Sequence, residues 1–110
     1  MADSRSEVLQ GTLEMMVLKL LTVEASHGWG LSFRLRQASR EVFDVNQGSL
    51  YPALQRLLRR GLIRSEWRAS DNNRRARYYQ ISAEGRRALE AAVTDWERSS
   101  TAVNRVLRFA

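Results

Sequence analysis

The C-terminal quarter of the chain carries an apolar pattern that a small domain cannot cover by itself. Six residues follow one another at alternating intervals of four and three, as in a heptad seam interrupted by one serine: Leu89, Val93, Trp96, Ser100, Val103 and Leu107. The pattern predicts a helix over residues 83–110, of which about 26 residues would span roughly 39 Å. The rest of the chain is too short to bury such a stripe. We therefore expect a homodimer joined through the five apolar seam residues. A helix folded back over its own domain is the alternative.

Composition excludes several classes of protein. The 110 residues allow one domain, and the absence of cysteine excludes disulfides, iron–sulfur clusters, zinc fingers and thiol nucleophiles. His27 is the one histidine, so no site with several histidine ligands can form, and we expect neither metal nor cofactor. There is no glycine-rich phosphate loop, no pair of carboxylates placed to flank a catalytic cleft and no nucleophile with a base, so we expect no enzyme. We find no apolar run long enough for a membrane helix and no signal-peptide pattern at the start, and therefore expect a cytoplasmic protein.

The positive charge is concentrated in one stretch. Seventeen of the eighteen cationic residues are arginine, and the whole net charge of +6 lies between residues 51 and 80. That stretch has eight arginines against Glu66 and Asp71. Arginine makes bidentate contacts with phosphates and guanine edges, so the clustering indicates a nucleic-acid binder. A solvated, arginine-rich surface is the alternative.

The first half of the chain predicts two helices after a polar start. Residues 1–9 lack periodicity and are expected to form a flexible tail. Apolar residues then recur with helical spacing between Gly11 and Glu24, which predicts the central core helix. A second helix is expected from near Trp29 to Ala38. His27 precedes it and is expected to be a capping or hinge histidine rather than a metal ligand.

A third helix is expected to end at Arg60, with Gly61 as the residue just beyond it. It begins with either Asn46 or Ser49 as its N-cap. Ser49 is the better fit, because Pro52 would then lie in the first turn, whereas a start at Asn46 costs one backbone hydrogen bond. With the leucines turned inward, the outward face is small at its start and cationic at its end. It comprises Gly48, Pro52, Gln55, Arg56 and Arg59, with Tyr51 on its flank.

Two alternating segments, residues 62–67 and 77–82, predict a β-hairpin. Between them, residues 70–73 have turn chemistry and Arg74 and Arg75 follow at once, so the tip of the hairpin should be cationic. Trp29 and Trp67 are expected to pack either in the core or on the wing. Ser82 can cap the last helix. Three helices followed by a hairpin indicate a mainly α (α+β) fold: a winged helix-turn-helix over residues 10–82, with a long C-terminal dimerisation helix over residues 83–110.

Several short motifs in this order resemble the PadR family of bacterial transcriptional regulators, specifically its short subfamily with one C-terminal helix. They are GTL at 11–13, HGWG at 27–30, GSLYPAL at 48–54, RRGLI at 59–63 and NRRARYY at 73–79. The resemblance covers about residues 10–107. The family more often has tyrosine where this chain has Trp29, and often histidine where it has Gln55.

The resemblance implies a homodimer that binds a palindromic operator, usually as a repressor and often upstream of its own gene or of a transporter gene. Helix three would enter the major groove, and the hairpin would lie at the minor groove and its phosphates. The matching positions are Gln47, Ser49, Tyr51, Gln55 and the neighbouring Arg56 on the helix, and Asn73, Arg74, Arg75 and Arg77 on the hairpin.

Two questions stay open at this point. Trp96 is either a plain core residue of the dimer or, as in some short PadR-like proteins, part of an interface pore that stacks on a small aromatic effector; Ser100 would leave room for that pore. The alternative to a sequence-specific regulator is a non-DNA interaction or scaffold module, or a dimer that binds anions without sequence preference. Only a preference for one duplex over another separates these functions.

Overall fold

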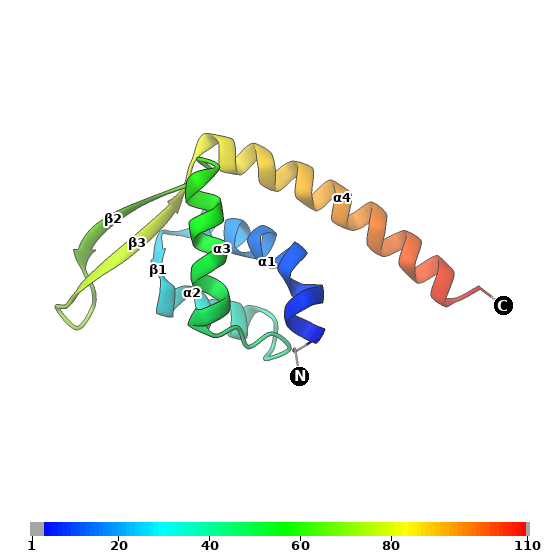
Figure 1. The fold of residues 1–110 in the computed structure, drawn as a ribbon, viewed down its shortest axis with the longest axis horizontal. Helices are drawn as coiled ribbons and strands as arrows, with labels where there is room; N and C mark the ends of the chain where they lie inside the picture. The colour runs from blue at the N-terminus through cyan, green and yellow to red at the C-terminus, as the bar shows by residue number, and fades with distance from the viewer. Residues whose placement is uncertain (1–3, 110) are drawn as a thin grey trace.

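The computed structural model describes residues 4–109, with side chains described from Thr12 onward. The elements run in the order α1 (Ser4–Val23), β1 (Ser26–His27), α2 (Gly28–Ala38), α3 (Gln47–Arg59), β2 (Ile63–Ala69), β3 (Arg75–Ile81) and α4 (Ala83–Leu107). Three helices lie together, the β2–β3 hairpin extends from them on one side, and α4 runs away on the other (Figure 1). The predicted fold class, a winged helix-turn-helix with a long C-terminal helix, is confirmed.

The core is built on α1, which contacts α2, α3 and α4. Leucines dominate it because each helix presents apolar residues at intervals of three and four toward the same centre. The buried residues of the three helices are Leu13, Val17, Leu18, Leu21, Leu31, Leu35, Leu50, Ala53, Leu54 and Leu57. Each large aliphatic side chain buried in this way contributes roughly 1.5–3 kcal/mol. This core holds α3 at a fixed orientation to the hairpin.

The first helix begins earlier than expected. Residues 4–9, predicted to belong to a flexible tail, are part of α1 in the structure, while residues 1–3 lie outside the described part of the chain. The prediction rested on the absence of apolar periodicity there. A helix that the core has already nucleated extends through polar residues at little cost, so periodicity is a poor guide to where it begins.

At the start of α3, the structure selects Asn46 as the N-cap. The Asn46 side chain accepts a hydrogen bond of 2.9 Å from the backbone N–H of Ser49. The alternative favoured from the sequence, Ser49 as cap, is therefore wrong. Pro52 lies inside the helix, and it has no N–H to donate to the carbonyl of Gly48 one turn earlier.

The end of α3 is as predicted. Gly61 has a φ of +71°, in the left-handed region that glycine adopts without strain. Its N–H donates to the Leu58 carbonyl, and the N–H of Leu62 donates to the Leu57 carbonyl, each at 3.0 Å. This pair of bonds is the Schellman arrangement, which stops the helix and turns the chain directly into β2.

The hairpin is antiparallel, with Ser65 opposite Tyr79 and Trp67 opposite Arg77. We call β2, β3 and the turn at residues 70–74 the wing. A third strand, β1, pairs with β3 and gives the order β1-β3-β2. The sequence did not predict β1, because two residues carry no detectable alternation. This short strand joins the turn between α1 and α2 to the base of the wing.

The last helix is fixed to the protein at its first turn. The Ser82 hydroxyl accepts from the N–H of Gly85 at 3.0 Å and donates to the Gly61 carbonyl at 2.7 Å, so the predicted cap is confirmed. A Cβ at Gly85 would overlap the carbonyl oxygen of Leu62. Only glycine permits this close approach of α4 to the start of β2.

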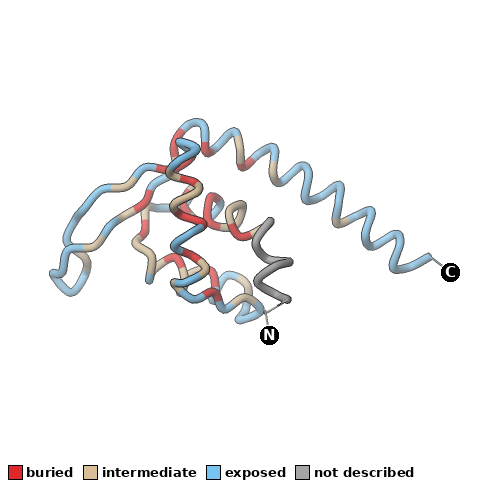
Figure 2. Tube along the Cα trace, viewed as in Figure 1, coloured by how far each residue is buried: buried red, intermediate tan, exposed pale blue. Residues whose placement is uncertain are grey.

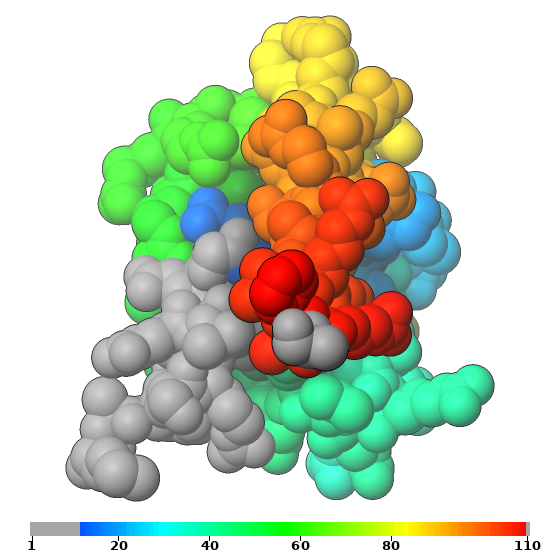
Figure 3. Space-filling view, turned by 90° about the vertical axis from the view of Figure 1, so that its right-hand side faces the viewer, coloured from blue at the N-terminus to red at the C-terminus, as the bar shows by residue number. Residues whose placement is uncertain are grey.

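Beyond its first turns, α4 extends away from the rest of the protein (Figure 1). Along the seam the exposed fraction rises from 8% at Leu89 to 36% at Val93, 49% at Trp96, 55% at Val103 and 75% at Leu107. Figure 2 shows the helix exposed over most of its length, and Figure 3 shows its end standing in front of the remaining residues. We call residues 12–92 the body and residues 93–109 the projecting segment. The body does not cover the apolar seam of this segment.

Among the residues that the structure describes, no helix combines the length and apolarity that crossing a bilayer requires.

Candidate nucleic-acid interface

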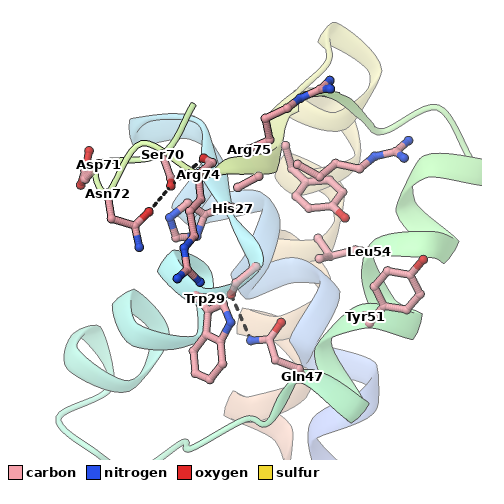
Figure 4. Close-up of a pocket in the computed structure, with 14 residues that line it drawn as sticks. His27, Trp29, Gln47, Tyr51, Leu54, Ser70, Asp71, Asn72, Arg74 and Arg75 are labelled. Atoms are coloured by element: carbon pink, nitrogen blue, oxygen red, sulfur yellow. Dashed lines mark hydrogen bonds between the residues drawn. The ribbon is translucent and has the colours of Figure 1, made fainter. Parts of the chain in front are cut away.

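A cleft of about 610 Å³ opens between the wing, the start of α2 and the exposed side of α3. Figure 4 shows its residues converging from these three elements. The α3 side provides Gln47, Tyr51 and Leu54; the wing and α2 provide His27, Gly28, Trp29, Ser70, Asp71, Asn72, Arg74, Arg75, Ala76, Arg77 and Tyr79. We call it the wing cleft. It brings together, in space, residues as far apart in the sequence as His27 and Tyr79.

The tip of the wing is a tight turn organised by Ser70. The Ser70 N–H donates to the carbonyl of Arg74 at 2.6 Å, and its hydroxyl lies 2.8 Å from the same oxygen and 2.6 Å from Asn72 Oδ1. Asn73 has a φ of +62°, which asparagine tolerates better than most residues. The turn places Asn73 and Arg74 at the exposed tip, as predicted. Asn73 does not line the cleft.

The wing arginines carry uncompensated charge. Arg74, Arg75 and Arg77 are exposed, and none has an ion pair with an acidic side chain among residues 12–109. Arg68, on the other face of the wing, pairs with Glu66 at 2.8 Å. Three arginines therefore line one cleft in which Asp71 is the one acidic residue among the described lining residues. Such a surface attracts phosphate groups.

The predicted residues of α3 divide into two groups. Tyr51 is 57% exposed and lines the cleft, and Gln47 also lines it. The Gln47 amide donates to the Gly28 carbonyl at 3.2 Å and to the Ser32 hydroxyl at 2.7 Å, so this side chain also fixes α3 to α2. Ser49 and Gln55 are half-buried on α3 and do not line the cleft.

Arg56 is directed into the protein. Its Nε lies 3.4 Å from Glu14 Oε2, and the arginine side chain is only 30% exposed. Arg60 approaches the other oxygen of the same carboxylate at 3.6 Å. Glu14 therefore links α1 to α3. The structure does not bring Arg56 to the cleft, because a carboxylate 42 positions earlier in the chain holds it.

His27 is the N-cap of α2, as predicted. Its Nδ1 accepts from the N–H of Gly30 at 3.0 Å, and its ring meets the ring of Tyr78 edge-on at 5.2 Å between centroids. Because Nδ1 is the acceptor, the neutral ring carries its proton on Nε2. Within the described residues there is no cluster of three side chains suited to hold a metal ion.

Neither Trp29 nor Trp67 packs in the core; Trp67 packs beside arginines on the wing, which is the other alternative of the prediction. Trp29 is 75% exposed in the cleft, and Trp67 is 56% exposed on the wing. Trp29 precedes the first buried residue of α2, Leu31, so the hydrophobic side of that helix does not reach it. The guanidinium carbons of Arg75 and Arg77 lie 5.5 and 5.9 Å from the centre of the Trp67 ring. One clue lay in the sequence: Trp67 belongs to an alternating hairpin next to a run of arginines.

Tyr79 closes the inner wall of the cleft. Burial raises the pKa of its phenol, although the neighbouring Arg77 guanidinium acts in the opposite direction. The hydroxyl therefore stays protonated at neutral pH, and the wall of the cleft adds no negative charge that would repel phosphate.

Solved structures share this architecture. The chain is 32% identical to a PadR-like transcriptional regulator from Bacillus cereus, with a TM-score of 0.80, over 94% of this chain and 99% of the other. It is 30% identical to a PadR family transcriptional regulator from Eggerthella lenta, with a TM-score of 0.81, over 94% and 88% of the two chains. A transcriptional regulator from Clostridium thermocellum is 27% identical, with a TM-score of 0.83, over 90% and 96%.

The sequence also matches a family model, the Transcriptional regulator PadR-like family, over residues 17–91. This span runs from the middle of α1 into α4 and includes α3 and the whole wing. More than half of the chain is covered, and the structural neighbours agree in fold and in description. The protein therefore belongs to the PadR-like family of transcriptional regulators, a class of DNA-binding regulators that are not enzymes.

Proposed function

We propose that the protein is a homodimeric repressor that recognises a palindromic operator in double-stranded DNA. The observation that supports this most strongly is the wing cleft, where three arginines with no acidic partner among residues 12–109 line the same surface as Gln47 and Tyr51 of α3. The major groove of B-DNA, about 12 Å wide, admits one α-helix. A helix in that groove places the wing over the adjoining backbone and minor groove.

In this arrangement α3 reads bases and the wing binds backbone. Ser49, Tyr51 and Gln55 contact base edges or phosphates from α3, and Gln47 does so while it also holds α2. The Tyr51 hydroxyl is the best placed of these, because its side chain is exposed and lines the same cleft as the wing arginines. Asn73, Arg74, Arg75 and Arg77 bind phosphates at or beside the minor groove, where closely spaced phosphates favour arginine.

The projecting segment provides the dimer interface. Its seam exposes Val93, Trp96, Val103 and Leu107, continuing from the buried Leu89. A second copy packed along this seam removes the apolar surface from water and generates a two-fold axis. A two-fold symmetric protein matches an operator whose half-sites are inverted repeats. Bound at a promoter, such a dimer represses by excluding RNA polymerase.

Trp96 and Ser100 form the candidate effector site within that dimer. Trp96 is half-exposed, and Ser100 lies one turn further along the same face. In a dimer the two Trp96 rings would flank a space that accepts a flat aromatic molecule. Quenching of tryptophan fluorescence by planar aromatic compounds, lost in Trp96→Leu and retained in Trp29→Leu, is the expected result. Equal quenching in the two variants would place the effector elsewhere.

The operator test uses fluorescence anisotropy with the duplex that the wild-type protein enriches from a random-sequence library. We expect binding that survives excess unrelated duplex and weakens steeply with salt. The double substitution Arg74→Ala and Arg75→Ala should reduce affinity about a hundredfold and lower the salt slope by about two. The matched control is Arg86→Ala with Arg87→Ala, another adjacent pair of exposed arginines, on α4 away from the cleft. If no sequence is enriched, the protein is an anion-binding dimer without sequence preference.

A further inference from the structure

One face of the wing places an indole beside two arginines. Side chains alternate between the two faces of a strand, and opposite residues of a hairpin share a face. Trp67 lies opposite Arg77, and Ala69 lies opposite Arg75, so Trp67 and both arginines share one face. The same face continues through Ser65 and Tyr79 to the buried Ile63 and the partly buried Ile81 at the base of the wing.

The indole ring contacts both guanidinium groups. Their carbons lie 5.5 Å and 5.9 Å from the ring centre, within the range in which a cation is attracted by an aromatic face. Arg77 also donates from Nε to the Ser65 hydroxyl at 2.9 Å. Trp67 itself is 56% exposed, so core packing does not account for a residue of this size here. Its described contacts are with charged side chains that line the wing cleft.

The opposite face of the wing provides a contrast. There Arg68 lies 4.7 Å from the centre of the Tyr78 ring, which is a similar contact, but Glu66 neutralises its charge at 2.8 Å. Arg75 and Arg77 have no acidic partner within residues 12–109. On the Trp67 face, the ring restrains the arginines without consuming the charge that would bind phosphate.

We propose that Trp67 is a positioning residue for DNA binding, whose ring holds Arg75 and Arg77 in the orientation in which they meet the duplex. An arginine side chain has many rotamers, and ordering them is part of the cost of binding. A ring that orders two arginines in the free protein removes this cost from the binding step. The inference rests on the proposed DNA-binding role of the wing.

Two substitutions separate the aromatic face from the bulk of the side chain. Trp67→Leu keeps an apolar side chain and removes the ring, whereas Trp67→Phe keeps a ring with a weaker attraction for cations. We expect Trp67→Leu to reduce operator affinity about tenfold, and Trp67→Phe about threefold. Thermal unfolding should change little in either variant, since the side chain is more than half exposed.

A double-mutant cycle tests whether Trp67 acts through the arginines. In a protein that already carries Arg75→Gln and Arg77→Gln, Trp67→Leu should change affinity less than twofold. In the Arg68→Gln background, which alters the other face of the same wing, Trp67→Leu should keep its full effect of about tenfold. An equal loss in all three backgrounds would overturn the proposal, because Trp67 would then contribute without the arginines.

A measurement on the free protein separates this proposal from the operator proposal. A ring above a guanidinium shifts the NMR signals of the arginine side chain upfield. Trp67→Leu should abolish that shift for Arg75 and Arg77 and preserve the corresponding shift of Arg68, which lies over Tyr78. Unchanged Arg75 and Arg77 signals in Trp67→Leu refute the positioning role even if the operator binds normally. A protein that enriches no duplex but shows the shifts contradicts the operator proposal and leaves the restraint of the arginines established.

Discussion

Leu89 and Leu107 lie on the same seam of α4, yet one is 8% exposed and the other 75% exposed. Leu89 packs in the body, where α1 covers the first turns of α4. Leu107 ends the projecting segment, which no described part of this chain covers (Figure 2). The same residue type at the same helical position is buried in the body in one case and exposed to solvent in the other. An apolar repeat identifies the face of a helix, but not the partner that covers it.

The projecting segment allows the most direct test of the contrast between Leu89 and Leu107. Replacing both Val103 and Leu107 by arginine puts like charges on an apolar seam and should raise the dissociation constant of the proposed dimer at least a thousandfold, about 4 kcal/mol. Sedimentation equilibrium measures the change. Val42→Arg, at a residue of the α2–α3 loop that is 63% exposed, is the control and should leave the dimer intact. A double variant that is still dimeric would show that another surface joins the copies.

In the body, the close approach at Gly85 is the most sensitive point of α4. Alanine usually stabilises a helix relative to glycine, by about 1 kcal/mol. Here the added Cβ meets the Leu62 carbonyl, so Gly85→Ala should lower the free energy of unfolding by about 3 kcal/mol. Urea unfolding at a fixed protein concentration measures this, with Arg86→Ala, an exposed neighbour, as the control. A neutral or stabilising Gly85→Ala would mean that α4 is not held tightly against the body.

Two ion-paired carboxylates, Glu14 and Asp95, compare the two regions at a finer scale. Glu14 pairs with Arg56 and Arg60 in the body at a side-chain exposure of 22%, and one of its oxygens is buried without a hydrogen bond. Asp95 pairs with Arg98 in the projecting segment at an exposure of 72%. Glu14→Gln should cost about 1 kcal/mol of unfolding free energy, and Asp95→Asn at most about 0.3 kcal/mol. Equal costs in urea unfolding would show that the body screens this pair as well as water does.

The smallest expected effect concerns alkaline pH. Burial raises the folded-state pKa of Tyr79 above its value in the unfolded chain, so the folded state retains this proton longer. The resulting stability is complete below the unfolded pKa, near 10, and is lost as pH rises through the folded pKa. From pH 9 upward, the free energy of unfolding should therefore fall less steeply with pH in Tyr79→Phe than in the wild type. Parallel curves for the two proteins would refute the assignment.

Local rules account for most of the elements. Helical spacing located the core helices, and the chemistry of Gly61 and Ser82 located where α3 ends and α4 begins, because each of these signals acts within a few residues. The choice between Asn46 and Ser49 was not decided in this way. Both residues can cap, and the structure takes Asn46 although it leaves Pro52 inside the helix. A bond of 2.9 Å from Ser49 to the Asn46 side chain is part of what offsets that loss.

The candidate site was harder to predict, because its contacts join distant residues. The sequence around Arg56 does not predict Glu14 as its partner. The sequence around Ser26 likewise does not predict that β1 pairs with β3 at Tyr79. The size of Trp29 and Trp67 favours burial in general, whereas here Trp29 is exposed on α2 in the wing cleft and Trp67 is exposed on the wing beside two arginines. The wing arginines were predicted correctly as exposed, since a turn tip has few ways to bury charge.

The joint between the wing and α4 has a geometric consequence. Strand β3 ends at Ile81 and α4 begins at Ala83, so Ser82 alone separates them and no linker absorbs motion. A helix of 25 residues is a rigid lever of about 38 Å. Turning it by about 10° at Ser82 moves its far end by roughly 7 Å, which is about twice the rise per base pair of a DNA duplex. If two such helices pack against each other in a dimer, the angle between β3 and α4 at Ser82 sets the distance between the two wings.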